Sequence, residues 1–153
     1  MPEGAVRVAG DAAEVARAEA QAVLAMVQDE GRRHRIADLL AALAEGEVGE
    51  DDAGPLEELL ELGLQTGRIR SLYGPEGEQA ALGLYRRLPA GRELTRSARD
   101  LNDALEALEG RTIDRVSVNA VGPGEYGVTI STPDFEVVLR LGKAGARIAT
   151  IGA

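Results

Sequence analysis

The hydrophobic periodicity of this chain changes once, near Thr112, from a helical repeat to a strand repeat. Upstream of that point, apolar residues recur at three- and four-residue spacing, as on one face of a helix. Downstream they alternate with polar residues, as Val116 and Val118 do with Ser117 and Asn119. The two periods require different backbones, so the sequence predicts helices first and a sheet afterwards.

Four alternating segments follow the change of period, at residues 115–120, 126–131, 135–141 and 146–151. The segments between them carry Gly, Pro and Asp, which preset or permit turn dihedrals. Alternation indicates one face in water and one face on helices, and the apolar stripe of residues 94–109 is the expected cover. We therefore predict an α+β fold: about four helices, then a four-stranded antiparallel β-meander packed on helix 94–109.

Residues 12–44 carry two apolar stripes that would lie on opposite sides of one helix. Asp11 is the expected N-cap, and Ile36 would lie about 180° from Val27 around a continuous helix. The chain either breaks at Gly31 into an antiparallel pair or forms one helix of about thirty residues. We favour the single helix because no Pro and no second turn former lies near Gly31.

Such a helix has more apolar surface than one small neighbour would cover, which predicts self-association through it. The residues expected at that seam are Val23, Val27, Ile36, Leu40 and Leu43.

Residues 45–54 have no apolar period and are rich in Gly, Asp and Glu, which favours a linker. Pro55 is then placed as the first residue of a helix that ends before Gly67, and Pro75 opens another. The predicted organisation is an N-terminal helical arm at 1–44, an acidic linker at 45–54 and an α+β domain at 55–153.

The chemistry available to the side chains is limited. The chain has no cysteine, so thiolate nucleophiles, thiolate metal sites and disulfides are excluded. His34 is the only histidine, and no G-x-S-x-G motif supplies a serine for a Ser-His-Asp triad. We weighed a metal site with Glu30 and Asp38, but the neighbouring arginines disfavour cation binding. We therefore expect no metal, no cofactor and no common catalytic motif.

Residues 122–127 match G-x-G-x-x-G letter by letter, yet the dinucleotide fingerprint requires a helix after the glycines. A strand-period segment follows here, so the motif predicts a hairpin turn.

The charge of the chain is unevenly distributed. The net charge is −9, with −10 in residues 1–66, +4 in 67–99 and −3 in 100–153. An acidic chain repels nucleic acid, so we expect the basic segment to face carboxylates of a protein partner. Its candidate contact residues are Arg86, Arg87, Arg92, Arg96 and Arg99.

Three hypotheses about function follow. The leading one is a non-catalytic protein–protein interaction or assembly module that forms homo-oligomers through the N-terminal helix. The second is a small-molecule-binding or acid/base enzyme domain with a pocket between sheet and helices, lined by Tyr85, Asp114 and Tyr126. The third, which the acidic charge disfavours, is nucleic-acid binding by the arginines.

The sequence predicts a cytoplasmic protein that does not enter membranes. The first residues lack a basic segment followed by an apolar run, and no apolar stretch approaches the length of a membrane span. Lys143 is the only lysine among 17 basic residues, a bias that indicates the base composition of a bacterial genome.

Overall fold

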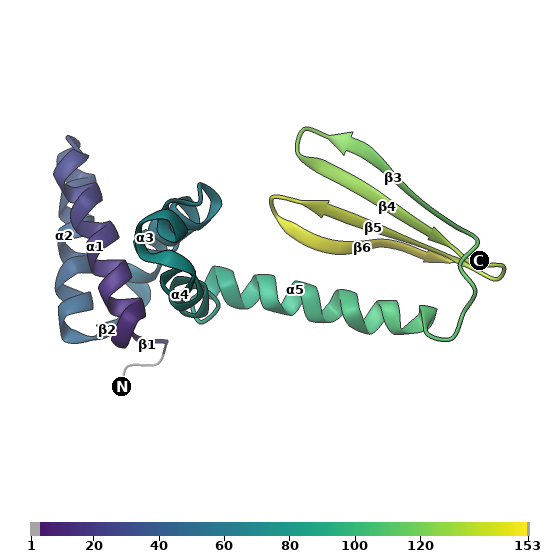
Figure 1. The fold of residues 1–153 in the computed structure, drawn as a ribbon, viewed down its shortest axis with the longest axis horizontal. Helices are drawn as coiled ribbons and strands as arrows, with labels where there is room; N and C mark the ends of the chain where they lie inside the picture. The colour runs from purple at the N-terminus through teal and green to yellow at the C-terminus, as the bar shows by residue number, and fades with distance from the viewer. Residues whose placement is uncertain (1–3, 153) are drawn as a thin grey trace. The chain divides into compact units, whose positions relative to one another are not determined.

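A computed structural model describes residues 4–152 of the chain. Helices precede a four-stranded antiparallel sheet, which confirms the predicted α+β class (Figure 1). Two compact units divide between Arg92 and Glu93, and we call them the helical unit and the C-terminal unit. This division differs from the predicted one, which placed a linker at residues 45–54.

The helical unit begins with β1 (Val6–Arg7), followed by α1 (Gly10–Met26) and α2 (Glu30–Glu45). Two predictions are wrong here. The helix starts at Gly10 with Ala9 as its N-cap and no side-chain cap, so Asp11 does not cap it. Residues 12–44 form two helices that lie against each other, and the break is at 27–29 rather than at Gly31.

Local hydrogen bonds explain this break. The Asp29 carboxylate accepts the Arg32 backbone N–H at 2.7 Å and so caps α2. The Arg33 side chain donates to the carbonyl oxygens of Leu24 and Val27, which are left without helical partners at the end of α1. An Asx cap therefore interrupts the helix where no Gly or Pro marks a turn.

The acidic segment is also structured. Gly46 ends α2 with φ 81°, and β2 (Glu47–Val48) pairs antiparallel with β1. Helix α3 (Glu50–Gln65) starts with three acidic residues in its first turn, where the helix dipole favours negative charge. Pro55 therefore lies inside α3 and is not its first residue.

Helix α4 (Arg68–Tyr85) is kinked at Gly74, which has φ 72° and ψ −177°. The predicted break at Gly74-Pro75 is thus present as a kink. Side chains from α1 to α4 form one buried core, in which Leu39, Leu56 and Leu60 are fully inaccessible. At the end of this unit the Glu57 carboxylate accepts the Ala90 N–H at 2.7 Å, and so caps the first turn of the next helix.

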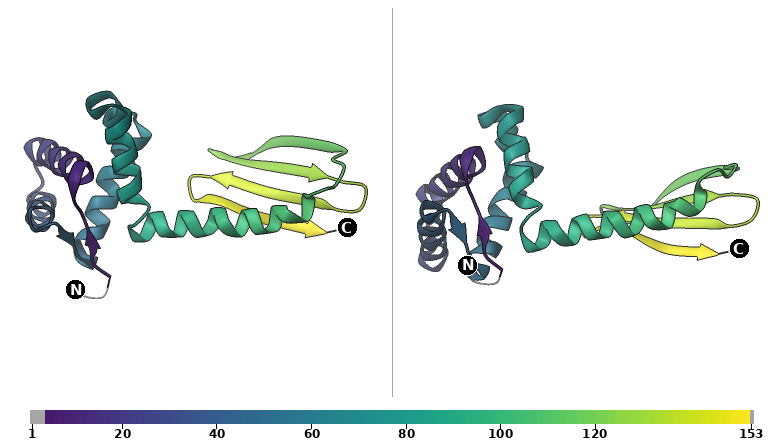
Figure 2. Two further views of the ribbon diagram at one scale, coloured as in Figure 1. Left: turned by 60° about the horizontal axis from the view of Figure 1, so that its bottom comes forward. Right: turned by 90° about the horizontal axis from the view of Figure 1, so that it is seen from below.

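The C-terminal unit contains most of α5 (Pro89–Leu105), a short 3₁₀ turn η1 (Glu106–Leu108) and four strands. The strands are β3 (Arg115–Gly122), β4 (Glu125–Ser131), β5 (Glu136–Gly142) and β6 (Gly145–Gly152). They pair in sequence order, as the meander predicts, and the sheet packs on α5 (Figure 2). The G-x-G-x-x-G segment forms the β3–β4 hairpin, as predicted.

The strand register collects apolar side chains on one face of the sheet. Val118 of β3 pairs with Val128 of β4, Val128 with Leu139 of β5, and Leu139 with Ile148 of β6. Directly paired residues project to the same face of an antiparallel sheet. Val116 and Tyr126 belong to the neighbouring rows of paired residues on either side, and they project to the same face.

Candidate functional site

Four of the five residues predicted to mediate self-association pack within the helical unit, and the fifth, Val27, is half-buried at the end of α1. Ile36 and Leu43 are buried in its core, and Val23 and Leu40 are half-buried against that core. Because residues 12–44 are a helical hairpin, the apolar stripes face their own chain. The premise of a long helix without an internal partner is therefore wrong.

The three residues proposed to line a pocket between sheet and helices lie in different settings. Tyr85 is buried in the helical unit, where its hydroxyl donates to Glu61 Oε1 at 2.6 Å. Burial, followed by the Glu61 carboxylate, raises the pKa of Tyr85 to about 12. Asp114 is exposed just before β3, and Tyr126 is 52% exposed on the sheet.

The candidate arginines are all exposed but belong to both units. Arg86, Arg87 and Arg92 lie in the helical unit, and Arg96 and Arg99 lie in the C-terminal unit. The Arg87 guanidinium donates to the Arg7 carbonyl oxygen at 2.7 Å, and thereby ties the end of α4 to β1.

The sequence also raised His34 as a candidate metal ligand. The His34 imidazole lies 3.7 Å from Asp38 on the exposed side of α2. Within residues 4–152, no group of three His, Asp or Glu side chains is arranged to hold a metal ion. The same residues contain no helix both long and apolar enough to span a membrane.

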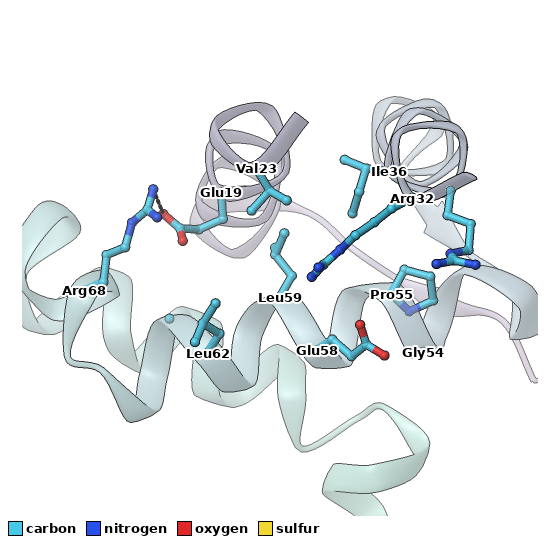
Figure 3. Close-up of a pocket in the computed structure, with 12 residues that line it drawn as sticks. Glu19, Val23, Arg32, Ile36, Gly54, Pro55, Glu58, Leu59, Leu62 and Arg68 are labelled. Atoms are coloured by element: carbon cyan, nitrogen blue, oxygen red, sulfur yellow. Dashed lines mark ion pairs between the residues drawn. The ribbon is translucent and has the colours of Figure 1, made fainter. Parts of the chain in front are cut away.

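A groove between α1, α2 and α3 has a volume of about 350 Å³ (Figure 3). We call it the α1–α2–α3 groove. Its apolar side chains come from all three helices, and Leu62 on its rim is 59% exposed. They are Val23, Ile36, Pro55, Leu59 and Leu62.

A buried carboxylate lies at one end of this groove. Glu19 is only 2% exposed, and its Oε1 accepts the Tyr73 hydroxyl at 3.1 Å. Arg68 Nη2 lies 3.5 Å from the same oxygen and supplies the opposite charge, as Figure 3 shows. Burial, followed by the hydrogen bond to Glu19, raises the pKa of Tyr73. The charge of Glu19 is therefore compensated within the chain.

The other charged groups of the groove have no such compensation. Arg32 and Arg35 extend from α2, and both are exposed. Among the described residues neither side chain forms an ion pair, and the salt bridges found there join other residues. Glu58 of α3 is the remaining carboxylate of the groove and is also exposed.

The sheet of the C-terminal unit presents a second candidate surface. On its apolar face Val137 is fully buried and Leu139 is 7% exposed, both on β5. Exposure rises from β5 towards both edge strands: Val116 and Val118 of β3 are 56% and 64% exposed, and Ile151 of β6 is 48% exposed. Within residues 4–152, β3 pairs with β4 alone, whereas the Ser97 hydroxyl of α5 donates to the Ala146 carbonyl on the opposite edge strand β6. The β3 edge is therefore open.

The sequence did not predict the groove, and it indicated an open sheet edge without showing which one. Glu19 stands among Ala16, Ala20 and Val23 at helical spacing, so its position in the stripe indicated a buried carboxylate. Nothing in the sequence showed which helices would meet around Arg32 and Arg35. The β3 edge had a signal, since a meander always has two edges.

Comparisons with known proteins place the chain in no family. No family model matches it, and neither a curated protein nor a solved structure shows significant similarity.

Proposed function

We propose that this chain is a non-catalytic assembly module that self-associates through the β3 edge of its C-terminal sheet. One observation carries the proposal: β3 is an open edge strand whose apolar residues are exposed beside an apolar sheet face. An edge of this kind offers unpaired backbone N–H and C=O groups to another strand. The proposal keeps the predicted homo-oligomer but moves its seam away from the N-terminal helix.

The central part of β3 lacks the features that normally protect an edge. Proteins block such edges with Lys, Pro, inward-pointing charges or bulges. Between Val116 and Ala120 the strand has none of these, and its register with β4 becomes irregular only between Ala120 and Gly122. Arg115 is the only charged residue of the strand.

Two copies of β3 can pair antiparallel about a two-fold axis at Val118. This register uses the regular part of the strand, residues 116–120, and places Val118 opposite its own copy. Ser117 then faces Asn119 of the second chain, and Val116 faces Ala120. The apolar face of one sheet then continues into the apolar face of the other, and no like charges face each other. Pairing would join two four-stranded sheets and reduce the exposure of the Val116 and Val118 side chains.

The first experiment measures the mass of the full chain by native mass spectrometry and light scattering over a range of concentrations. We expect a dimer whose dissociation constant rises at least about 100-fold in Val118→Lys, because two ammonium groups would face each other. Val118 is largely exposed, so the substitution has little effect on the folded monomer. Leu72→Lys on α4 is the matched control, since Leu72 is 59% exposed in the other unit.

A charge swap then tests the register. Val118→Glu is expected to be monomeric like Val118→Lys, whereas an equimolar mixture of the two is expected to form the heterodimer. A wild-type chain that stays monomeric at all concentrations would overturn self-association. A dimer unaffected by Val118→Lys would keep the assembly function but reject this edge.

The other two hypotheses have less support. Tyr85 is buried in the helical unit, whereas Asp114 and Tyr126 are exposed in the C-terminal unit. The exposed arginines are the remaining basis for nucleic-acid binding, and the described residues that lie beside them include no exposed aromatic cluster for base stacking.

A further inference from the structure

We propose that the α1–α2–α3 groove binds a small amphiphilic anion, an aliphatic chain that ends in a carboxylate. This site is independent of the self-association proposed above, since all its residues belong to the helical unit. Two features of the groove carry the proposal: an apolar lining that the chain leaves open, and two guanidinium groups without ion-pair partners.

The apolar lining fits an aliphatic chain. Val23 from α1, Ile36 from α2 and Leu59 from α3 meet at the groove, and Leu62 extends the apolar surface to the rim (Figure 3). The cavity volume of about 350 Å³ is at the lower end of the range of small-molecule sites. An occupant of this size would cover apolar side chains that otherwise contact water.

The charges select the head group. Arg32 and Arg35 lie three residues apart on α2 and so project from neighbouring positions of one helix face. Arg68 faces Glu19, whose carboxylate already has Tyr73 and Arg68 as partners. The free positive charge therefore belongs to Arg32 and Arg35, and a guanidinium forms paired hydrogen bonds with a carboxylate.

Both parts of the ligand are needed. Residues 1–66 carry a net charge of −10, so the surroundings repel a simple anion such as acetate. Glu58 lies in the groove itself and opposes the head group. Contact of the chain with Ile36 and Leu59 has to offset this repulsion, and the guanidinium groups then distinguish an acid from an alcohol of equal length.

The test is calorimetric titration of the full chain with decanoate and, separately, with 1-decanol, below the concentrations at which decanoate forms micelles. We expect decanoate to bind at least about tenfold more tightly than decanol, and acetate not to bind. Arg32→Gln with Arg35→Gln should weaken decanoate binding about tenfold or more. Arg17→Gln is the control, because Arg17 is exposed on α1 outside the groove.

A variant that is expected to strengthen decanoate binding distinguishes a specific site from a loss of folding. Glu58→Gln should tighten decanoate binding a few-fold, because it removes a negative charge from the groove. Circular dichroism of each variant checks that the helices are intact. Equal binding of decanol and decanoate, no decanoate binding, or equal effects of the groove and control variants would overturn the proposal. Val118→Lys should bind decanoate like the wild type, so this result does not depend on assembly.

Discussion

In the helical unit Leu39, Leu56 and Leu60 are fully buried between facing helices, whereas in the C-terminal unit Val116 and Val118 stand 56% and 64% exposed on an apolar sheet face. Val137 and Leu139 are the only buried apolar side chains of the C-terminal unit among residues 4–152. The helical unit thus contains a core of many fully buried apolar side chains, whereas few apolar side chains of the C-terminal unit are buried.

The difference follows from the shapes of the elements. A helix has one apolar stripe, and the helices of the first unit turn their stripes towards a common core. A four-stranded sheet has a wide apolar face, and the C-terminal unit has the single helix α5 beside it, so that Val116 and Val118 on β3 stay exposed. This difference in burial is the reason for placing the proposed association in the second unit.

The largest effect should come from the helical core. Leu60→Ala removes a fully buried side chain and should lower the free energy of unfolding by about 2–5 kcal/mol. Leu72→Ala, at an exposed position of α4, should change it by less than about 0.5 kcal/mol. Urea unfolding followed by circular dichroism at 222 nm measures both. Equal costs would show that the core is not closed as the structure describes.

A smaller difference in the free energy of unfolding is expected between alanine substitutions of two valines on the same face of the sheet. Val137→Ala should cost about 2 kcal/mol, because this side chain is fully buried, and Val116→Ala less than about 0.5 kcal/mol. Both are measured by urea unfolding in the Val118→Lys background, so that association does not contribute. A cost at Val116 as large as that at Val137 would mean that the face is covered as far as β3.

The smallest effect at neutral pH concerns the buried tyrosine of the helical unit. The pKa of Tyr85 is raised to about 12 by burial and Glu61, so folding favours the protonated phenol. The stability from this group is complete below the unfolded pKa of about 10 and is lost as pH rises towards 12. Absorbance at 295 nm, as the difference between wild type and Tyr85→Phe, should therefore titrate near 12.

The midpoint of this titration also tests whether the Tyr85 hydroxyl is bound to Glu61. A midpoint near 10 would show that the Tyr85 hydroxyl is hydrated and does not bind Glu61. Tyr85→Phe should in addition flatten the fall of stability between pH 10 and 12.

Local signals were sufficient for the sheet and insufficient for the N-terminal hairpin. The alternation around Val118 and Val128 and the turns between strands predicted the meander, because strand period and turn chemistry are both properties of neighbouring residues. The break at residues 27–29 was missed because it depends on Asp29 acting as a cap, which the sequence shows only as one more acidic residue. The acidic segment at 45–54 was mistaken for a linker for a related reason: its acids are the first turn of α3.

The sequence by itself determined the order of helices and strands, the apolar face of each element and the lack of thiol chemistry, since these depend on composition and on residues close in the chain. Only the tertiary structure decided that Ile36 and Leu43 face their own core, that Arg32 and Arg35 line a groove with Leu59, and that β3 remains an open edge. Those outcomes depend on which faces meet. A periodic stripe of apolar residues indicates that a helix or strand face is buried, but it does not indicate which other element covers that face.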